Sequence, residues 1–154
     1  TILMDHEDCK QTSEQEFKKI EEIIKKLIGK KFTDFDKKER PLTIKDFLIV
    51  APYNAQVNFL LARLPEGTRC GTIDRFQGQE APVTIISMTS SDLESLPRNK
   101  SFFFNSNRLN VAISRAQCLS IILINPKLLE SPPKTYEEFK LMNNFQKLFK
   151  LTIK

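Results

Sequence analysis

Glycine is scarce in this chain of 154 residues: it occurs four times, at positions 29, 67, 71 and 78. A nucleotide-hydrolysing P-loop needs GxxxxGK followed by Ser or Thr, so that backbone amides wrap the phosphates and the hydroxyl holds magnesium. None of the four glycines begins that pattern, and the chain also lacks GxGxxG, HExxH and a nucleophile elbow. Taken alone, the chain has no visible means of hydrolysing a nucleotide.

Cysteine and histidine are also scarce. Cys9, Cys70 and Cys118 lie far apart with no CxxC pair, and His6 is the one histidine. These residues fit neither a zinc site nor a disulfide framework. We therefore expect no metal site, reduced thiols that are buried or half-buried, and a cytoplasmic location.

Long apolar runs are absent too. No run approaches roughly 18 residues, so no membrane span is expected. The N-terminus lacks the basic, apolar and small-residue parts of a secretory signal. It also lacks an initiator Met, so we expect a piece of a longer polypeptide.

What is present is an ordinary globular composition. Apolar residues make up 40% and charged residues 28%, and 154 residues suffice for one domain with its own core. The formal net charge of +5 is a mild bias toward polyanions such as nucleic acid.

Apolar patterning predicts alternating strands and helices. Strands are expected at 46–52, 69–73, 83–89 and 119–124, and helices at 12–28, 54–64, 105–116, 126–129 and 135–151. The charged stretch 30–41 and the polar stretch 90–100 are expected to be loops. This alternation predicts a three-layer α/β/α sandwich with a mainly parallel sheet.

The chain is expected to have three segments: an N-terminal extension at 1–11 that looks disordered, the α/β domain at 12–130, and a C-terminal helical extension at 131–154. The first helix opens with a capping-box pattern. Thr12 or Ser13 is expected to cap it, and Gln15 or Glu16 to reach back to the free amides.

Two stretches concentrate polar groups. The stretch 68–80 is a short strand followed by a tight turn rich in hydrogen-bonding groups, which is typical of a site at the carboxyl edge of a parallel sheet. The helix 105–116 places Arg108 and Arg115 two turns apart, so both guanidinium groups can lie on one side of it.

Three segments match a known set of motifs in order and spacing. They are 51–56 (APYNAQ), 71–80 (GTIDRFQGQE) and 107–116 (NRLNVAISRA). They resemble motifs IV, V and VI of superfamily 1 helicases, in the branch that translocates 5′ to 3′ and includes the nonsense-decay helicase. The wider stretches 71–91 and 101–116 look similar to a bacterial group in which a RecB-like nuclease precedes the helicase.

The resemblance implies the second RecA-like domain of a two-domain motor. The first RecA-like domain, with the P-loop and the magnesium-binding acid, is expected upstream in the same polypeptide. ATP with Mg²⁺ would bind between the two domains, and this fragment alone would be inactive. Arg115 matches the motif VI arginine finger, whose planar and permanently charged fork suits the γ-phosphate.

Other matching residues imply contacts with the nucleotide. Glu80 matches a carboxylate that accepts hydrogen bonds from ribose hydroxyls, and Gly78 lets the backbone come close. Gln77 is expected beside them as a hydrogen-bonding sensor. Arg108 is either a second phosphate contact or a structural partner of Asp74, and the sequence leaves both open.

A further set implies contacts with a single strand, in which hydroxyls and backbone amides hold phosphates without reading sequence. DNA is favoured over RNA as that strand. These residues follow three predicted strands and are Pro52, Tyr53, Asn54, Thr72, Asp74, Ser90 and Ser91.

Two other classes stay open. A degenerate α/β module would bind nucleic acid or a protein partner without hydrolysis, and an intact P-loop upstream would argue against it. A flavodoxin-like or receiver-like domain would need an acidic pocket or a flavin phosphate loop after the first strand, where residues 51–53 offer neither.

Overall fold

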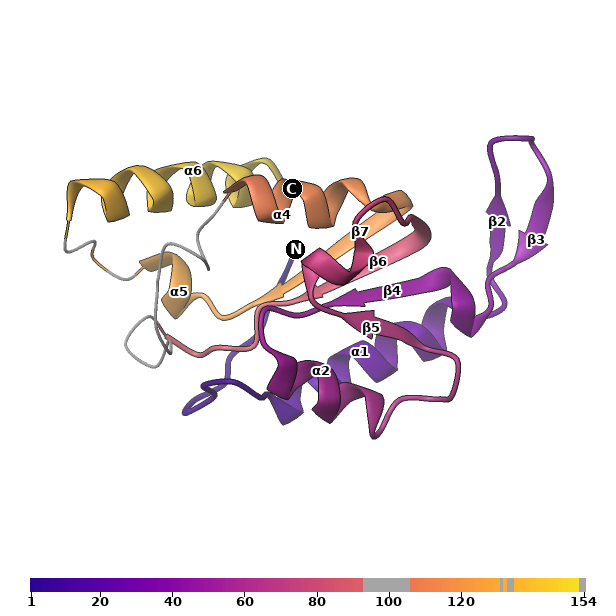
Figure 1. Cartoon of the computed structure of the whole chain (residues 1–154), viewed down its shortest axis with the longest axis horizontal. Coiled ribbons are helices and arrows are strands. Elements are labelled where there is room, and N and C mark those ends of the chain that lie inside the picture. The colour runs from indigo at the N-terminus through magenta and orange to yellow at the C-terminus, as the bar shows by residue number, and fades with distance from the viewer. Residues whose placement is uncertain (93–105, 131, 133–134, 153–154) are drawn as a thin grey trace.

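The computed structural model describes residues 1–92, 106–130, 132 and 135–152. Parallel strands form one sheet in the order β1-β7-β6-β4-β5, and helices cover both of its faces (Figure 1). The strands are β1 (Ile2–Leu3), β4 (Phe47–Val50), β5 (Arg69–Gly71), β6 (Ala81–Ser87) and β7 (Ala116–Ile124). The helices are α1 (Glu14–Leu27), α2 (Asn54–Leu61), α4 (Ser106–Ser114), α5 (Lys127–Glu130) and α6 (Tyr136–Thr152), with short 3-10 helices η1 (Ile44–Asp46) and η2 (Ile73–Phe76). The predicted three-layer α/β fold with a parallel sheet is confirmed.

Two apolar clusters fill the space between the sheet and its helices. Because successive side chains of a strand point to opposite faces, Leu48 and Val50 pack toward α4 and α6, whereas Phe47 and Ile49 pack toward α1 and α2. Every residue of β4 and β6 is buried, as expected for central strands covered on both faces.

The sequence predicts a loop at the charged stretch 30–41, but the structure has an antiparallel hairpin there. Its strands are β2 (Lys31–Thr33) and β3 (Glu39–Pro41), and it projects from the body of the domain (Figure 1). In the turn, Asp34 Oδ1 accepts the Lys38 N–H at 2.9 Å. Phe32 is the one buried residue of these two strands, so their apolar pattern is too weak to predict them.

The N-terminal residues are folded into the domain, so the expectation of a disordered stretch there is wrong. β1 pairs with the end of β7, with Ile2 beside Leu123, and His6 and Cys9 are buried. A strand of two residues carries too little pattern to be seen in a sequence. The segment boundaries after residues 11 and 130 stay predictions, and most of the expected 90–100 loop lies outside the described residues.

The start of α1 follows the prediction in part. Ser13 caps the helix, and its Oγ accepts the Glu16 N–H at 3.2 Å. Neither candidate reaches back to the cap, however. Gln15 Oε1 faces the Cys9 thiol at 3.7 Å, and the Glu16 carboxylate is buried against the Thr89 backbone.

None of the three cysteines forms a disulfide. Cys9 and Cys70 are buried, and burial raises the pKa of the Cys70 thiol to about 12. Cys118 is exposed on β7, which corrects the expectation that every thiol is at least half-buried. Within the described ranges, no helix combines the length and apolar character needed to cross a membrane.

Candidate nucleotide and strand-binding site

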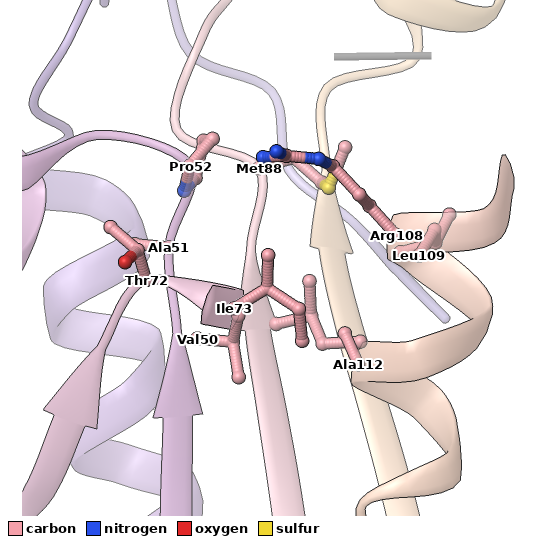
Figure 2. A pocket seen from close by; sticks show the side chains of 10 residues that line it. Val50, Ala51, Pro52, Thr72, Ile73, Met88, Arg108, Leu109 and Ala112 are labelled. Atoms are coloured by element: carbon pink, nitrogen blue, oxygen red, sulfur yellow. The ribbon is translucent and has the colours of Figure 1, made fainter. Parts of the chain in front are cut away.

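The carboxyl ends of β4 and β5 meet at one edge of the sheet, beside the first turn of α4. A small cavity of about 60 Å³ lies there. Pro52 follows β4, Thr72 follows β5 and Met88 follows β6, so three strand ends contribute to its lining. Figure 2 shows the Arg108 side chain extending from α4 toward Pro52 and Met88 across the top of this cavity.

The stretch 72–80 leaves this edge instead of forming one site there. η2 runs along the sheet face that α4 covers, because Phe76 packs in the same cluster as Leu109 and Ala112. Glu80 then directly precedes the first residue of β6. Thr72 therefore lies at the carboxyl ends of the strands and Glu80 at their amino ends. The sequence predicts instead that the whole stretch gathers at the carboxyl edge.

A larger hollow of about 260 Å³ opens between η2 and α4. Arg108 and Arg115 both line it, which confirms that the seven-residue spacing brings them to one side of the helix. Gln77 lies on the opposite wall with Asp74, and Arg108 Nη1 is 3.5 Å from Asp74 Oδ2. The full lining is Ile73, Asp74, Gln77, Asn107, Arg108, Val111 and Arg115.

Arg115 follows the last residue of α4 and is half-buried. Its Nε is buried and makes no hydrogen bond to any described residue. A buried donor left in this state costs free energy on the order of 1–3 kcal/mol, so native proteins usually satisfy it.

Gly78 and Glu80 flank the hollow without lining it. Gly78 has φ 77°, and a Cβ at this position would meet no atom within 4 Å, so its backbone is open to a ligand. Glu80 is exposed, and its Oε2 accepts the Gln117 amide at 3.4 Å. It lies near Arg115, because the next residue, Ala81, donates its N–H to the Arg115 carbonyl at 3.0 Å.

The residues predicted to hold a single strand fall into two groups. The accessible group lies along the carboxyl edge and in the adjoining hollow: Asn54 and Asp74 are exposed, and Pro52, Tyr53 and Thr72 are half-buried. Burial raises the pKa of the Tyr53 hydroxyl, because the charged phenolate would lose solvent.

Ser90 and Ser91 form the second group and are buried. Ser90 Oγ donates to the Lys10 carbonyl at 2.7 Å and lies 3.3 Å from the Tyr53 hydroxyl. Ser91 Oγ accepts the Cys9 N–H at 3.0 Å. A strand could therefore touch these hydroxyls only after the N-terminal residues had moved aside.

A buried polar network that the sequence motifs do not indicate lies behind this edge. Its members are His6, Glu16, Gln56, Ser87, Thr89, Ser91 and Asn125, all nearly inaccessible to solvent. One signal was available: Glu16 precedes Ile20 by one helical turn and so occupies the apolar face of α1. A carboxylate on an apolar helix face indicates a buried partner, since buried charges are rarely left unpaired.

Comparison with known proteins agrees with this geometry. A family model described as an AAA domain matches residues 3–127. The chain is 32% identical over 131 residues to the putative helicase mov-10-B.1 of Danio rerio, covering 75% of this chain and 13% of that protein. It is 32% identical over 127 residues to the uncharacterized ATP-dependent helicase MJ0104 of Methanocaldococcus jannaschii, covering 80% of this chain and 16% of that protein.

The mouse RNA helicase Mov10l1 is 38% identical over 96 residues, covering 58% of this chain and 8% of that protein. The chain therefore spans only a small part of the length of each of these three relatives. The matched segment contains all the motif residues described above, from Pro52 to Arg115, on a sheet with parallel strands. The chain belongs to this AAA domain family and is a helicase-like domain of superfamily 1.

Proposed function

We propose that this chain is the second motor domain of an ATP-dependent superfamily 1 helicase. The observation that carries the proposal is the hollow between η2 and α4, where Arg108, Arg115 and Gln77 converge. Two guanidinium groups suit the charge spread over a triphosphate, and each can form paired hydrogen bonds to phosphate oxygens.

In this proposal Arg115 is the arginine finger. Its half-buried position restricts the side chain, and Arg115 lines the hollow in which the phosphates are placed. Such a residue contributes roughly a thousandfold or more to the rate of phosphoryl transfer. Beside Arg115, Glu80 accepts hydrogen bonds from the ribose hydroxyls. Gly78 lets the backbone come close to the nucleotide.

The hollow supplies cations and one carboxylate, Asp74, which faces Arg108. This donor set fits the phosphates of ATP better than it fits a magnesium ion, which prefers several oxygen ligands. The P-loop and the Mg²⁺ ligands are therefore assigned to a first RecA-like domain of the same polypeptide. The sequence contains no P-loop, so the 154 residues alone should not hydrolyse ATP.

The strand is proposed to run along the carboxyl edge, against Pro52, Tyr53, Asn54 and Thr72, with Asp74 nearby. Contacts of this kind would hold the sugar-phosphate backbone and be sensitive to salt. DNA is the strand favoured from the sequence. The name of mouse Mov10l1 includes RNA helicase, so RNA is tested beside it. The RecB-like nuclease neighbour and the cytoplasmic location stay predictions.

The test is ATP hydrolysis by the natural polypeptide that contains this chain, measured with and without single-stranded DNA or RNA. Strand-stimulated turnover is expected, and Arg115→Ala should reduce it by a hundredfold or more. Arg63→Ala is the matched control, because Arg63 lies on the opposite face of the sheet, stacked on Phe59. Turnover of Arg115→Ala near that of the wild type would refute the finger assignment.

A degenerate module that binds nucleic acid without hydrolysis is the second candidate. It is supported by the strand-binding edge, which does not depend on the nucleotide hollow. The same experiment separates the two, since the module would retain strand binding and show no turnover in either protein.

A further inference from the structure

The buried carboxylate of Glu16 is the meeting point of a polar network behind the carboxyl edge. Glu16 is 0% exposed. Both of its oxygens lie 3.0 Å from the Thr89 backbone nitrogen, one accepts the Ser87 hydroxyl, and Oε1 lies 3.2 Å from His6 Nε2. These contacts join α1, the end of β6 and the N-terminal residues.

Two groups donate hydrogen bonds to Glu16, the Thr89 N–H and the Ser87 hydroxyl. Ser91 Oγ accepts the Cys9 N–H and lies 2.8 Å from His6 Nδ1, and His6 Nε2 lies 3.2 Å from Glu16 Oε1, so the imidazole bridges Ser91 and Glu16. Ser87 Oγ accepts the Gln56 amide at 3.1 Å and donates its own proton to Glu16 Oε2. The carboxylate therefore accepts from the Thr89 N–H and the Ser87 hydroxyl.

The Glu16 carboxylate holds the backbone of Thr89. The φ of Thr89 is 67°, in the left-handed region that β-branched residues rarely adopt. The conformation is strained, and both Glu16 oxygens accept the N–H of this same residue. The next residue, Ser90, lies 3.3 Å from the hydroxyl of Tyr53. The chain of contacts thus leads from Glu16 to a side chain of the strand-binding edge.

The N-terminal strap, which we define as residues 4–10, closes this network. Met4 N–H donates to the Ile124 carbonyl at 2.8 Å, and Asn125 Nδ2 donates to the His6 carbonyl at 2.6 Å. At the other end, Ser91 N–H donates to the Cys9 carbonyl at 2.8 Å. The strap therefore ties the ends of β6 and β7 together across the carboxyl edge.

We propose that Glu16 is a positioning residue for strand binding. Together with the strap it holds residues 88–91 in their strained turn, and this turn fixes Tyr53 for the single strand. The inference rests on the proposed strand-binding edge. It does not require Ser90 or Ser91 to touch the strand, because both are covered by the strap.

The test is Glu16→Gln in the natural polypeptide, with strand-stimulated ATP hydrolysis measured against the concentration of single-stranded RNA or DNA. An amide of equal size keeps one acceptor oxygen, and its N–H group replaces the acceptor of the Thr89 N–H or of the Ser87 hydroxyl. The half-saturating strand concentration should rise about tenfold, as expected for one lost hydrogen bond to a charged group. Turnover at saturating strand should stay within twofold, whereas a merely destabilised protein would lose turnover and keep its half-saturation.

Adding Thr89→Gly to Glu16→Gln should restore strand binding. Glycine adopts a positive φ without strain, so the Glu16→Gln/Thr89→Gly variant should return to within threefold of the wild-type half-saturation. Lys127→Ala is the control, because it removes an exposed contact of the strap with Glu7 outside the network. It should leave half-saturation unchanged.

Unchanged half-saturation in Glu16→Gln, or failure of the glycine rescue, would overturn the inference. Strand binding is also measured directly by the anisotropy of a labelled strand. Wild-type protein that binds the strand without turnover would refute the proposed motor and still leave Glu16 testable by that binding assay.

Discussion

Arg108 Nη1 lies 3.5 Å from Asp74 Oδ2, across the hollow between α4 and η2. The Asp74 side chain is 71% exposed and that of Arg108 35% exposed, so the contact is too open to contribute more than about 1 kcal/mol to stability. The pair is therefore weak enough to be exchanged for a phosphate contact of Arg108. It holds the guanidinium at the mouth of the hollow, where a nucleotide would replace the carboxylate.

This relationship predicts different effects for the two partners. At saturating strand, Arg108→Ala should raise the KM for ATP about tenfold, because one charged phosphate contact is lost. Asp74→Asn should leave the KM unchanged or lower it, since a competing anion is removed. Equal increases in both variants would show instead that the pair acts as a structural unit.

Asp46 predicts a pH dependence of stability. Arg40 donates to both of its oxygens at 2.7 and 2.8 Å, and Thr43 donates from its backbone and hydroxyl. The hydrogen bonds from Arg40 are the main cause that lowers the pKa of Asp46 from 3.8 to about 2. Because the folded pKa lies below the unfolded one, the stabilisation is complete above about pH 4 and is lost as pH falls toward 2.

Asp46→Asn should therefore lower the free energy of unfolding by at most about 2 kcal/mol at neutral pH, and by much less near pH 2. Urea denaturation at several pH values measures this difference. Glu39→Gln, on the strand β3 that also carries Arg40, is the control, since the pair of Glu39 with Lys31 is exposed and should be worth no more than about 1 kcal/mol. A difference for Asp46→Asn that does not change with pH would contradict the assignment.

The substitution Gly78→Ala is expected to affect both stability and nucleotide binding. With φ 77°, an alanine there should cost about 1 kcal/mol of stability. Its Cβ would also enter the open space assigned to the nucleotide, so the KM for ATP should rise at least fivefold, or about 1 kcal/mol.

Gly29→Ala is matched to this change. Gly29 has φ 79°, and a Cβ there would also meet no atom within 4 Å, but this glycine follows α1 far from the hollow. The control should show the same loss of stability with an unchanged KM. A similar KM in both variants would place the nucleotide elsewhere.

Much of this domain could be predicted from local sequence. The buried runs at β4 and β6 and the helical spacing in α1 are properties of a few adjacent residues, and they survive into the structure. The seven-residue spacing of Arg108 and Arg115 likewise brings both to one hollow, because Arg108 lies in α4 and Arg115 directly follows its last residue.

Only the tertiary structure decided the rest. The course of residues 72–80 from one sheet edge to the other depends on Phe76 packing under α4. Ser90 and Ser91 are buried by residues distant in the sequence. The contact between His6 and Ser91, for example, joins residues about 85 positions apart. Such contacts arise when distant segments pack together, and no local period in the sequence encodes them.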